Sequence, residues 1–421
     1  MNDIAIIGGG LAGLSAGIMA RRMGHSVLLC EKKSYPFHKV CGEYISLESR
    51  NLLEWLGLPI DEWKLPILDQ FRITHHNGTE FRSKLPLGGI GISRFTLDHF
   101  LQKTLEKEGG IVLQNTKINS VTQQADFHVL ESTHGDYPSI DSRVVLGSFG
   151  RNKPTFANEN MKNTPIGKRI IEFSPLASKG GKVKDTQNEK HFIEFSPLTS
   201  KGGMVKDAQN AKRFIGVKMH VKADIPKNQI ELHHFPGGYC GISAIENDGY
   251  CLCYLLEEPI AKKSSGNLEE IEERYLFQNP VLKQYLSNFE ILTERVSTAG
   301  VFFSPRPLQK DGMLFLGDSA GMIPPLAGNG MSMALHSSVI ATQLVNSYLK
   351  GQIQKDRLIM EYEMQWQSTF STRLRMARGL QKIMEQPGMT AFSMAAFRTA
   401  PFLFRLAASQ THGKNIPIPV F

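Results

Sequence analysis

The sequence predicts an α/β protein in which a parallel sheet is joined by a separate antiparallel β lobe and by C-terminal helices. A strand, a glycine turn, a helix and a second strand within residues 3–31 predict the parallel sheet. Three short apolar runs within residues 230–256, separated by Pro-Gly-Gly and Asn-Asp-Gly, predict the antiparallel lobe. A helical pattern from about residue 354, rich in Met and Phe as far as Phe404, predicts the final helices.

The N-terminal elements follow one another closely along the chain. Residues 3–7 form an Ile-rich apolar run that stops at three glycines, and residues 11–24 then carry helical spacing with Gly24 as the stop. Residues 26–30 predict the next strand. Beyond them we expect a helix at 96–108, short strands at 111–113, 127–130 and 144–146, a meander at 230–235, 239–245 and 250–256, and a strand, loop and helix at 314–347.

Composition narrows the class of protein. Of 421 residues, 41% are hydrophobic and 21% are charged, which is typical of a globular protein with about two lobes. The five cysteines are odd in number and form no Cys-x-x-Cys pair, so we expect reduced thiols and neither disulfides nor a zinc site. No apolar leader and no run of about 18 apolar residues is present, so we expect no signal peptide, no membrane span and a cytoplasmic protein.

The net charge of +8 is concentrated in one segment. Residues 151–213 contain 13 Lys and Arg against 6 Asp and Glu, which leaves the rest nearly neutral and gives no basic footprint for nucleic acid. The same region holds a tandem repeat, residues 171–192 and 193–214, rich in Gly, Pro and Lys. We expect a surface insertion over residues 152–213, with a basic docking arm as the alternative.

The first turn carries the spacing Gly8-x-Gly10-x-x-Gly13 between a strand and a helix, with Glu31 after the second strand. Gly8 permits the tight turn, Gly10 lets the backbone approach a pyrophosphate, and Gly13 lets helix and strand pack closely. The helix N-terminus presents free N–H groups to the phosphates, and Glu31 can accept hydrogen bonds from an adenosine ribose. A chance glycine turn is the alternative, but strand, helix and acid stand in the order that dinucleotide binding requires.

A second segment indicates which dinucleotide binds. Residues 314–316 predict a strand that ends in Gly317-Asp318 and continues through Pro324-Pro325 and Gly328-Asn329-Gly330-Met331 into a helix. This segment resembles the Gly-Asp segment of flavoprotein monooxygenases of the aromatic-hydroxylase type and of their geranylgeranyl-reductase relatives. The resemblance implies an FAD-binding Rossmann-like domain of the glutathione-reductase type. In that family the Asp carboxylate binds a ribityl hydroxyl, and the Pro-Pro turn brings a helix N-terminus to the pyrimidine edge of the flavin. An ordinary helix cap is the alternative role for Asp318.

Two shorter segments carry the same resemblance. Residues 93–98, Ser-Arg-Phe-Thr-Leu-Asp, are similar to the family's Arg-x-x-Leu-Asp helix start, which implies that Arg94 lies against FAD; a solvated surface Arg is the alternative. Residues 38–43 resemble the Lys-x-Cys-Gly stretch of the reductase branch, which implies that the backbone from Lys39 to Gly42 runs beside the flavin. Cys41 is then either a redox or substrate-positioning thiol or a small packing residue.

The motifs and the resemblance together imply a set of FAD ligands and substrate contacts. The FAD ligands implied are Gly8, Gly10, Leu11, Ala12, Gly13, Glu31, Lys39, Gly42, Arg94, Gly317, Asp318, Pro325, Gly328, Asn329, Gly330 and Met331. Substrate contacts are expected at Cys41, Tyr239 and Cys240, and no catalytic residue is identified. No metal is expected, because His233 and His234 on one strand point to opposite faces and cannot chelate one ion together.

The chain departs from the family in two places. Hydroxylases carry an Asp-Gly pair near the end of the FAD domain that serves both FAD and NADPH, whereas residues 147–151 here read Gly-Ser-Phe-Gly-Arg. No second complete Gly-x-Gly-x-x-Gly exists, so the electron donor stays open, with NAD(P)H as the expectation. Where the reductase branch has bulky aromatics after the Tyr, this chain has Cys240 and Gly241, which disfavours a long isoprenoid substrate.

These observations predict an FAD-dependent oxidoreductase of four parts. The expected parts are an FAD-binding domain of residues 1–68, 88–150 and 296–350, a β-rich substrate domain of residues 69–87 and 214–295, the insertion 152–213 and a helical region 351–421. The leading expectation is a monooxygenase that hydroxylates an aromatic or lipid-like substrate with NAD(P)H and O2. Reduction of carbon–carbon double bonds is the alternative, and a flavin-bound protein without enzymatic activity is the third. A hydrophobic small molecule is the expected partner, peripheral membrane contact is compatible with it, and the oligomeric state is left open.

Overall fold

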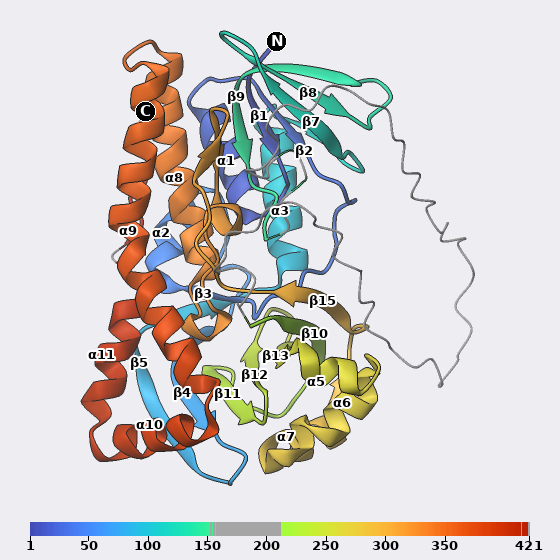
Figure 1. The fold of residues 1–421 in the computed structure, drawn as a ribbon, viewed down its shortest axis with the longest axis vertical. Coiled ribbons are helices and arrows are strands. Elements are labelled where there is room, and N and C mark those ends of the chain that lie inside the picture. The colour runs from blue at the N-terminus through green and yellow to red at the C-terminus, as the bar shows by residue number, and fades with distance from the viewer. Residues whose placement is uncertain (152–153, 155, 157–211, 414, 420–421) are drawn as a thin grey trace.

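Two β-sheets, one mainly parallel and one mainly antiparallel, organise the chain in the computed structural model (Figure 1). The structure describes residues 1–151, 154, 156, 212–413 and 415–419. The expected insertion and its tandem repeat fall almost entirely outside these residues. The α/β class and the Rossmann-like parallel sheet predicted from the sequence are confirmed.

The first sheet has the strand order β16-β17-β9-β1-β2-β6. Neighbouring strands from β17 to β6 run parallel, and β7 and β8 extend the sheet from β9 as an antiparallel meander. Its strands are β1 (Asn2–Ile7), β2 (Val27–Cys30), β6 (Ile111–Leu113), β7 (Ile118–Gln123), β8 (His128–Ser132), β9 (Ser139–Gly147), β16 (Gln309–Lys310) and β17 (Met313–Phe315). The predicted strands of this lobe are therefore confirmed.

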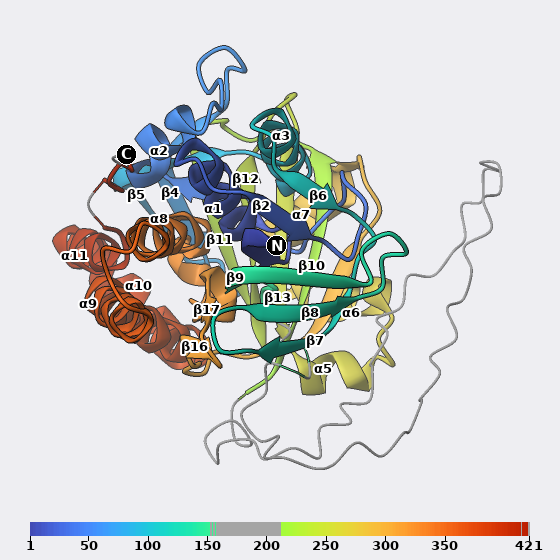
Figure 2. The same cartoon turned by 90° about the horizontal axis from the view of Figure 1, so that it is seen from above.

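Helix α1 (Leu11–Arg22) packs against both α3 (Arg94–Lys107) and α8 (Gly330–Leu349) beside this sheet. Figure 2 looks down on the lobe and shows α1 and α3 on one side of β1 and the β7–β8 hairpin on the other. Gly17 allows the close approach of α1 and α3, because a Cβ there would lie 2.9 Å from Leu105. The buried side chains of these helices and strands form one continuous apolar core.

The second sheet has the order β14-β10-β13-β12-β11-β4-β5-β3, and β15 also pairs with β10. The predicted meander is confirmed as β11, β12 and β13, which pair antiparallel in turn. The strands are β3 (Tyr44–Ser46), β4 (Ile67–Thr74), β5 (Glu80–Gly91), β10 (Phe214–Lys222), β11 (Gln229–Phe235), β12 (Gly238–Ala244), β13 (Tyr250–Glu257), β14 (Glu290–Ile291) and β15 (Val296–Val301). Strands β3 and β15 lie in this sheet although their residues fall within the expected FAD domain, because both pair with strands of the substrate lobe.

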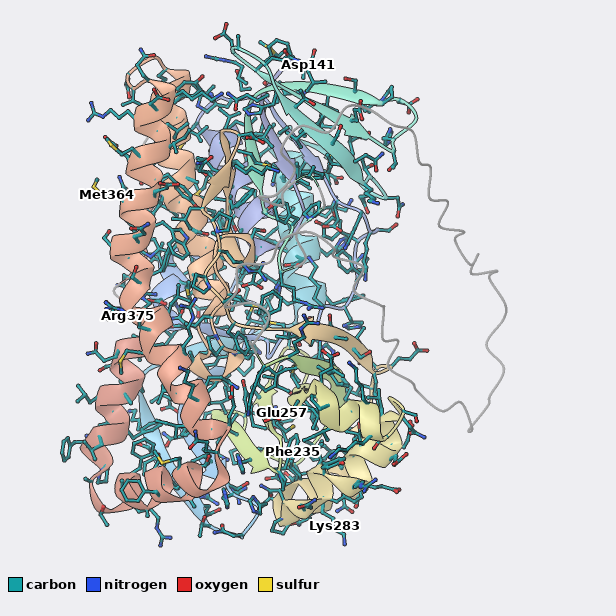
Figure 3. All side chains as sticks on the ribbon, in the orientation of Figure 1. Asp141, Phe235, Glu257, Lys283, Met364 and Arg375 are labelled. Carbon is teal, nitrogen blue, oxygen red and sulfur yellow. The ribbon has the colours of Figure 1, made fainter. Side chains whose placement is uncertain are left out.

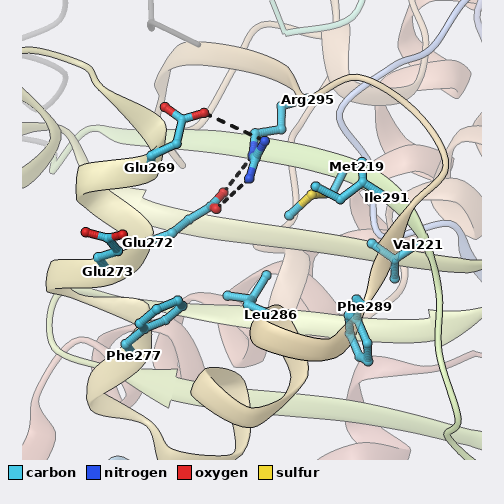
Figure 4. Close-up of a pocket in the computed structure, with 10 residues that line it drawn as sticks. All are labelled: Met219, Val221, Glu269, Glu272, Glu273, Phe277, Leu286, Phe289, Ile291 and Arg295. Atoms are coloured by element: carbon cyan, nitrogen blue, oxygen red, sulfur yellow. Dashed lines mark hydrogen bonds and ion pairs between the residues drawn. The ribbon is translucent and has the colours of Figure 1, made fainter. Parts of the chain in front are cut away.

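The two faces of the second sheet meet different surroundings. Helices α5 (Glu258–Lys263), α6 (Leu268–Arg274) and α7 (Pro280–Asn288), which the sequence reading did not predict, stand after β13 within the lobe. A cavity of about 200 Å³ lies between α6, α7 and strand β10, where Arg295 pairs with Glu272 (Figure 4). Met219 and Val221 line it, so the alternate residues of β10, Lys218 and His220, point the other way.

The C-terminal helices run along one side of both lobes (Figure 1). They are α9 (Lys355–Met384), α10 (Pro387–Thr399) and α11 (Pro401–Thr411), so helix is confirmed as far as Thr411. Tyr362, Trp366 and Phe370 of α9 belong to the core of the first lobe, and Met384 belongs to that of the second. Exposed side chains such as Met364 project outward from the same helix (Figure 3). Among the helices that the structure describes, none combines the length and the apolar character that crossing a membrane requires.

Candidate cofactor site

The glycine loop after β1 is closed at two of its glycines and open at the third. Gly8 has φ +104°, and a Cβ there would lie 2.5 Å from the carbonyl oxygen of Ser148. A Cβ on Gly13 would lie 2.3 Å from the carbonyl oxygen of Gly8. A Cβ on Gly10 would have only Arg94 Nη2, at 3.8 Å, and Lys39 Nζ, at 3.9 Å, within 4 Å. The loop therefore packs tightly where α1 meets β1 and stays open, between two cations, where a pyrophosphate would lie.

Asp98 holds these two cations beside Gly10. Its carboxylate lies 2.8 Å from Lys39 Nζ and accepts two hydrogen bonds from the Arg94 guanidinium, at 2.8 and 2.9 Å. Burial opposes ionisation of Asp98, but Arg94 and Lys39 outweigh it and hold its pKa below the usual value. Arg94 and Lys39 together carry two positive charges, and the Asp98 carboxylate balances one of them. The remaining positive charge favours an anionic ligand.

Glu31 and the first turn of α1 complete this side of the site. The carboxylate of Glu31 is buried at the end of β2 and accepts hydrogen bonds from the N–H groups of Gly9, at 2.8 Å, and Lys33, at 3.1 Å. Leu11 and Ala12 are buried in the first turn, whose amides have no acceptor within the helix. A carboxylate and unpaired amides at one helix end suit the ribose and the phosphates of a dinucleotide.

The segment at residues 317–318 lies against the first turn of α1, although more than 300 residues separate the two in sequence. Gly317 has φ +56°, and a Cβ there would lie 3.3 Å from the Cβ of Ala12. Its N–H donates to the hydroxyl of Ser337 on α8 at 3.0 Å. The two glycine-rich motifs therefore face one space.

Asp318 carries a carboxylate that accepts no hydrogen bond within the described part of the chain. The side chain is half-buried, and the charges of Arg306, Arg94 and Arg151 act on it. Burial raises its pKa, and the three arginines offset only part of that increase. A partly buried carboxylate without a donor is costly, so a ligand that brings hydroxyl groups would stabilise it.

The turn before α8 connects the cofactor side to the substrate lobe. Pro325 is exposed, and Gly328 has φ +63° with Tyr44 packed against it. Asn329 is buried and donates to the carbonyl oxygen of Thr411, while its own side-chain oxygen has no partner among the described residues. Gly330 and Met331 begin α8.

Cys41 and Gly42 lie over the second sheet. The thiol of Cys251 donates to the carbonyl oxygen of Cys41 at 3.3 Å, and the hydroxyl of Ser243 donates to that of Gly42 at 3.2 Å. Burial raises the pKa of the Cys41 thiol, with a smaller opposing effect of Arg94. The thiol is therefore protonated at neutral pH, and a Cβ on Gly42 would meet no atom within 4 Å.

The structure separates two of the expected substrate residues. The hydroxyl of Tyr239 accepts a hydrogen bond from the N–H of Leu326, at 3.2 Å, beside the turn before α8. Cys240 is the next residue of β12 and points to the opposite face, toward Glu272 and the cavity side. Tyr239 therefore borders the cofactor side of the sheet, and Cys240 does not.

A buried charged group at the junction of the lobes was not predicted from the sequence. Glu43 is fully buried, and its carboxylate accepts hydrogen bonds from Lys218 Nζ at 2.5 Å, His220 Nε2 at 2.7 Å and the N–H of Arg94 at 2.8 Å. Burial opposes its ionisation, but His220 and Lys218 outweigh this and hold the Glu43 pKa below its usual value. The signal in the sequence was Lys218 and His220 at alternate positions of an otherwise apolar strand.

Two arginines near Asp318 were also missed. Arg151 donates to the carbonyl oxygen of Ala299 at 2.8 Å, and Arg306 donates to the carbonyl oxygen of Arg151 at 2.8 Å. Neither stands in a motif that spacing could identify. In the stretch where hydroxylases have an acid, Ser148 donates to the carbonyl oxygen of Gly8 at 2.6 Å, so this residue supports the glycine loop.

The arrangement fits FAD on the evidence of its donors and open positions. Gly10, Lys39 and Arg94 would hold the pyrophosphate, Glu31 the adenosine ribose and Asp318 the ribityl chain. The unpaired side-chain oxygen of Asn329 lies in the turn that would meet the flavin ring.

Two family models match parts of the chain. One, described as FAD dependent oxidoreductase, matches residues 3–36. The other, described as Squalene epoxidase, matches residues 242–375. The first match covers the glycine loop and Glu31, and the second covers Asp318 and the turn before α8.

Similar proteins extend the likeness over most of the chain. Conditioned medium factor receptor 1 of Dictyostelium discoideum is 22% identical over 392 residues, which cover 89% of this chain and 69% of that protein. Digeranylgeranylglycerophospholipid reductase 1 of Methanothermobacter thermautotrophicus is 22% identical over 375 residues, 86% of this chain and 81% of that protein. Among solved structures, p-nitrophenol 4-monooxygenase from Pseudomonas putida superposes with a TM-score of 0.72 at 14% identity and covers 98% of both chains. At this identity the structural likeness shows the fold.

Proposed function

We propose that this chain, which contains an FAD-dependent oxidoreductase domain, reduces carbon–carbon double bonds of a hydrophobic, lipid-like substrate. The observation that carries the proposal is the similarity to digeranylgeranylglycerophospholipid reductase 1, because it spans 86% of the chain and includes both lobes. The absence of the hydroxylase acid at residues 147–151 supports the same choice. This ranking reverses the order in which the sequence alone placed hydroxylation and reduction.

Reduced FAD supplies a hydride when bound, and a proton must reach the second carbon of the double bond. The chain's own residues place two nitrogen-bearing side chains close to the proposed site. Lys218 and His220 project from β10 toward the FAD lobe, and Glu43 keeps both in place. We assign them the task of keeping a proton available at the lobe junction, since a general acid must lie within hydrogen-bond reach of the reacting group or of one intervening water.

The cofactor-facing side of the second sheet would accept the apolar substrate. Tyr239 and Gly241 alternate along β12 on this face, and a Cβ on Gly241 would meet no atom closer than 3.7 Å. The space beside Gly241 would admit an alkyl chain, in contrast to the bulky aromatics of the reductase branch. A small glycine here argues for a substrate of different shape from the long isoprenoids of that branch.

The experiment starts from purified yellow protein kept without oxygen. After reduction with dithionite, we would add an allylic isoprenoid alcohol and, as the control, its fully saturated analogue. The proposal expects the flavin to reoxidise only with the unsaturated alcohol and the product to gain one H2 per double bond. A flavin that stays reduced with every unsaturated lipid tested would contradict it.

Hydroxylation remains the second candidate, because the whole chain has the fold of p-nitrophenol 4-monooxygenase. It requires NADH or NADPH to bleach the flavin rapidly and hydrogen peroxide or a hydroxylated product to appear when air is admitted. Bleaching by dithionite alone would favour the reductase. Bleaching by no donor would favour a flavin-bound protein without enzymatic activity.

A further inference from the structure

Three histidines meet at the end of strand β4, on the face of the second sheet that also carries Tyr239. His75 and His76 follow Thr74, the last residue of β4, and His234 lies on β11. These strands pair parallel with Thr74 opposite His233, so His75 is the neighbour of His234 on the same face. The His75 and His234 rings stack with centroids 4.7 Å apart and planes 6° apart.

The nitrogen atoms of this histidine cluster (His75, His76 and His234) have the spacing of metal ligands. Nδ1 of His76 lies 3.4 Å from Nδ1 of His234. In a tetrahedral zinc site with Zn–N bonds of about 2.0–2.1 Å, two ligand nitrogens lie about 3.4 Å apart. One nitrogen of each of the three rings lies within 4.8 Å of the others, so His75 must approach the other two rings by no more than about 1.4 Å to complete the set.

Hydrogen bonding within the protein does not account for the cluster. One proton between His76 and His234 satisfies a single pair of nitrogens. Nε2 of His75 is buried and has no partner among the described residues, a loss of about 1–3 kcal/mol. The N–H of Asn77 donates to His75 Nδ1 at 3.3 Å. If Nε2 binds the metal, the ring proton sits on Nδ1, which can then no longer accept this one weak bond. The carbonyl of Met384 faces the His234 ring as an acceptor, which is the outer partner that ligating histidines usually have.

We propose that His75, His76 and His234 bind a divalent transition metal, zinc in the first place, with three imidazole ligands and one position open to water. Imidazole suits zinc, and three imidazole ligands leave room for one water as the fourth ligand of a tetrahedral site. The ion would join the β4–β5 turn to β11 and hold this end of the substrate lobe in register. His233 takes no part, since it points to the other face and bonds Thr74 there at 2.8 Å.

The group Glu43, His220 and Cys251 also has metal-like spacing but is not proposed. Lys218 Nζ lies 2.5 Å from the Glu43 carboxylate and occupies the position that a cation would need. The histidine cluster has no such competitor, because no Lys or Arg donates a hydrogen bond to its rings in the described part of the chain.

The test uses the full chain with FAD bound, freed of metal by dialysis against a chelator. Zinc chloride is titrated by calorimetry, and cobalt(II) chloride provides a visible spectrum that reports tetrahedral nitrogen ligation. The proposal expects one ion per chain and a melting temperature that rises with zinc concentration. His76→Ala is the variant, because His76 is the partly exposed member, and His134→Ala at a distant loop is the matched control.

Losing an outer partner of a ligand weakens metal binding by about 10- to 100-fold, so losing a ligand should cost at least about 100-fold. We expect this loss in His76→Ala and none in His134→Ala. Without metal, His76→Ala should keep the flavin content and melting temperature of the parent, which shows that it folds. Absence of saturable uptake by the parent chain, or equal zinc affinity in His76→Ala, would overturn the proposal, and neither result bears on double-bond reduction.

Discussion

At the scale of single residues, the proposed FAD site depends on charges that other side chains of the protein balance only in part. Arg94 and Lys39 share Asp98, whereas Asp318 receives no hydrogen bond within the described residues. A ligand that carries phosphates at one end and hydroxyl groups at the other would satisfy both ends of this arrangement. Each of these residues can therefore be tested by the flavin that the protein retains.

Replacement of Asp318 by Ala should remove most of the bound FAD. A hydrogen bond to a charged group contributes about 1.5–3 kcal/mol, which corresponds to about a 10- to 100-fold weaker affinity. The ratio of flavin absorbance to protein absorbance after gel filtration measures this. Asp311→Ala is the control, since Asp311 is exposed and lies in the turn before the same strand. Full flavin content in Asp318→Ala would show that its carboxylate does not hold the ribityl chain.

Glu43→Gln should destabilise the protein by about 3–5 kcal/mol near neutral pH, because Lys218 would keep a buried charge without its partner. The pH dependence has a definite sign. The Glu43 pKa lies below its usual value of 4.5 in the folded protein. The ionised carboxylate therefore contributes fully to the free energy of unfolding above about pH 4.5, and this contribution is lost as the pH falls through the lowered pKa. Urea unfolding followed from pH 8 down to about pH 2 should therefore show a shallower acid loss in the variant than in the parent.

Gly241→Phe should block the substrate without removing the cofactor. The new ring would fill the space beside Tyr239, where a Cβ on Gly241 has no contact closer than 3.7 Å. We expect normal flavin content together with turnover lowered by about 10-fold or more, an estimate equivalent to at least 1.4 kcal/mol of lost binding. Reoxidation of the reduced flavin by the unsaturated alcohol is the measurement. Unchanged rates would place the substrate elsewhere.

The sequence predicted those residues that act through local spacing. Gly8, Gly10 and Gly13 stand close together in the chain, and Arg94 and Asp318 each lie in a recognisable segment. Glu43 could not be found in this way, because its partners Lys218 and His220 come from a strand about 175 residues later. The histidine cluster was missed for the same reason: its second strand is adjacent only once the register of β4 and β11 is known.

At the scale of elements, the sequence predicted long helices better than short helices or strands interrupted by proline and glycine. Strand β5 was missed because Pro86 and the glycine pair at 88–89 argue against a strand. Helices α5, α6 and α7 were missed because each is shorter than the 10 to 12 residues that a periodic pattern needs. In contrast, α9 was expected because it runs for 30 residues.

Two glycine substitutions in helices should have opposite effects. Gly13→Ala places a Cβ 2.3 Å from the carbonyl oxygen of Gly8, so α1 must move away from β1. We expect a loss of about 1–3 kcal/mol in unfolding free energy and much weaker FAD binding. Gly379→Ala in α9 meets no atom within 4 Å and should stabilise the chain by about 0.5–1 kcal/mol with flavin unchanged. Equal effects of the two changes in urea unfolding would contradict the close packing at Gly13.

At the scale of the whole molecule, α9 joins the two apolar cores. Tyr362 packs in the first core and donates to the carbonyl oxygen of Phe315, just before the Gly317-Asp318 turn. Gln381 accepts from Tyr239 at 3.3 Å in the second lobe. A helix of 30 residues is about 45 Å long, so it reaches along both lobes as one rigid element.

Binding of FAD should therefore stabilise both lobes together. At a free FAD concentration of about 100 times the dissociation constant, the unfolding free energy should rise by about 2.7 kcal/mol. Differential scanning calorimetry should show one transition that moves to higher temperature as FAD is added. Two transitions, of which FAD shifts only the first, would show that α9 does not couple the cores.

The strand order of the first sheet has a consequence for the newly made chain on the ribosome. Strand β17 pairs with β9 through Leu314 and Leu146, so strands β10 to β15 of the second lobe, with helices α5 to α7, are synthesised between two neighbours of one sheet. Pairing partners so distant in sequence fold slowly, because a long loop must close first. The nascent N-terminal third can form β1, β2 and β9, but the carboxylate of Asp318 emerges only after three quarters of the chain. Until then the exposed edge of β9 is open to wrong pairing, and cofactor capture belongs to the last stage of biosynthesis.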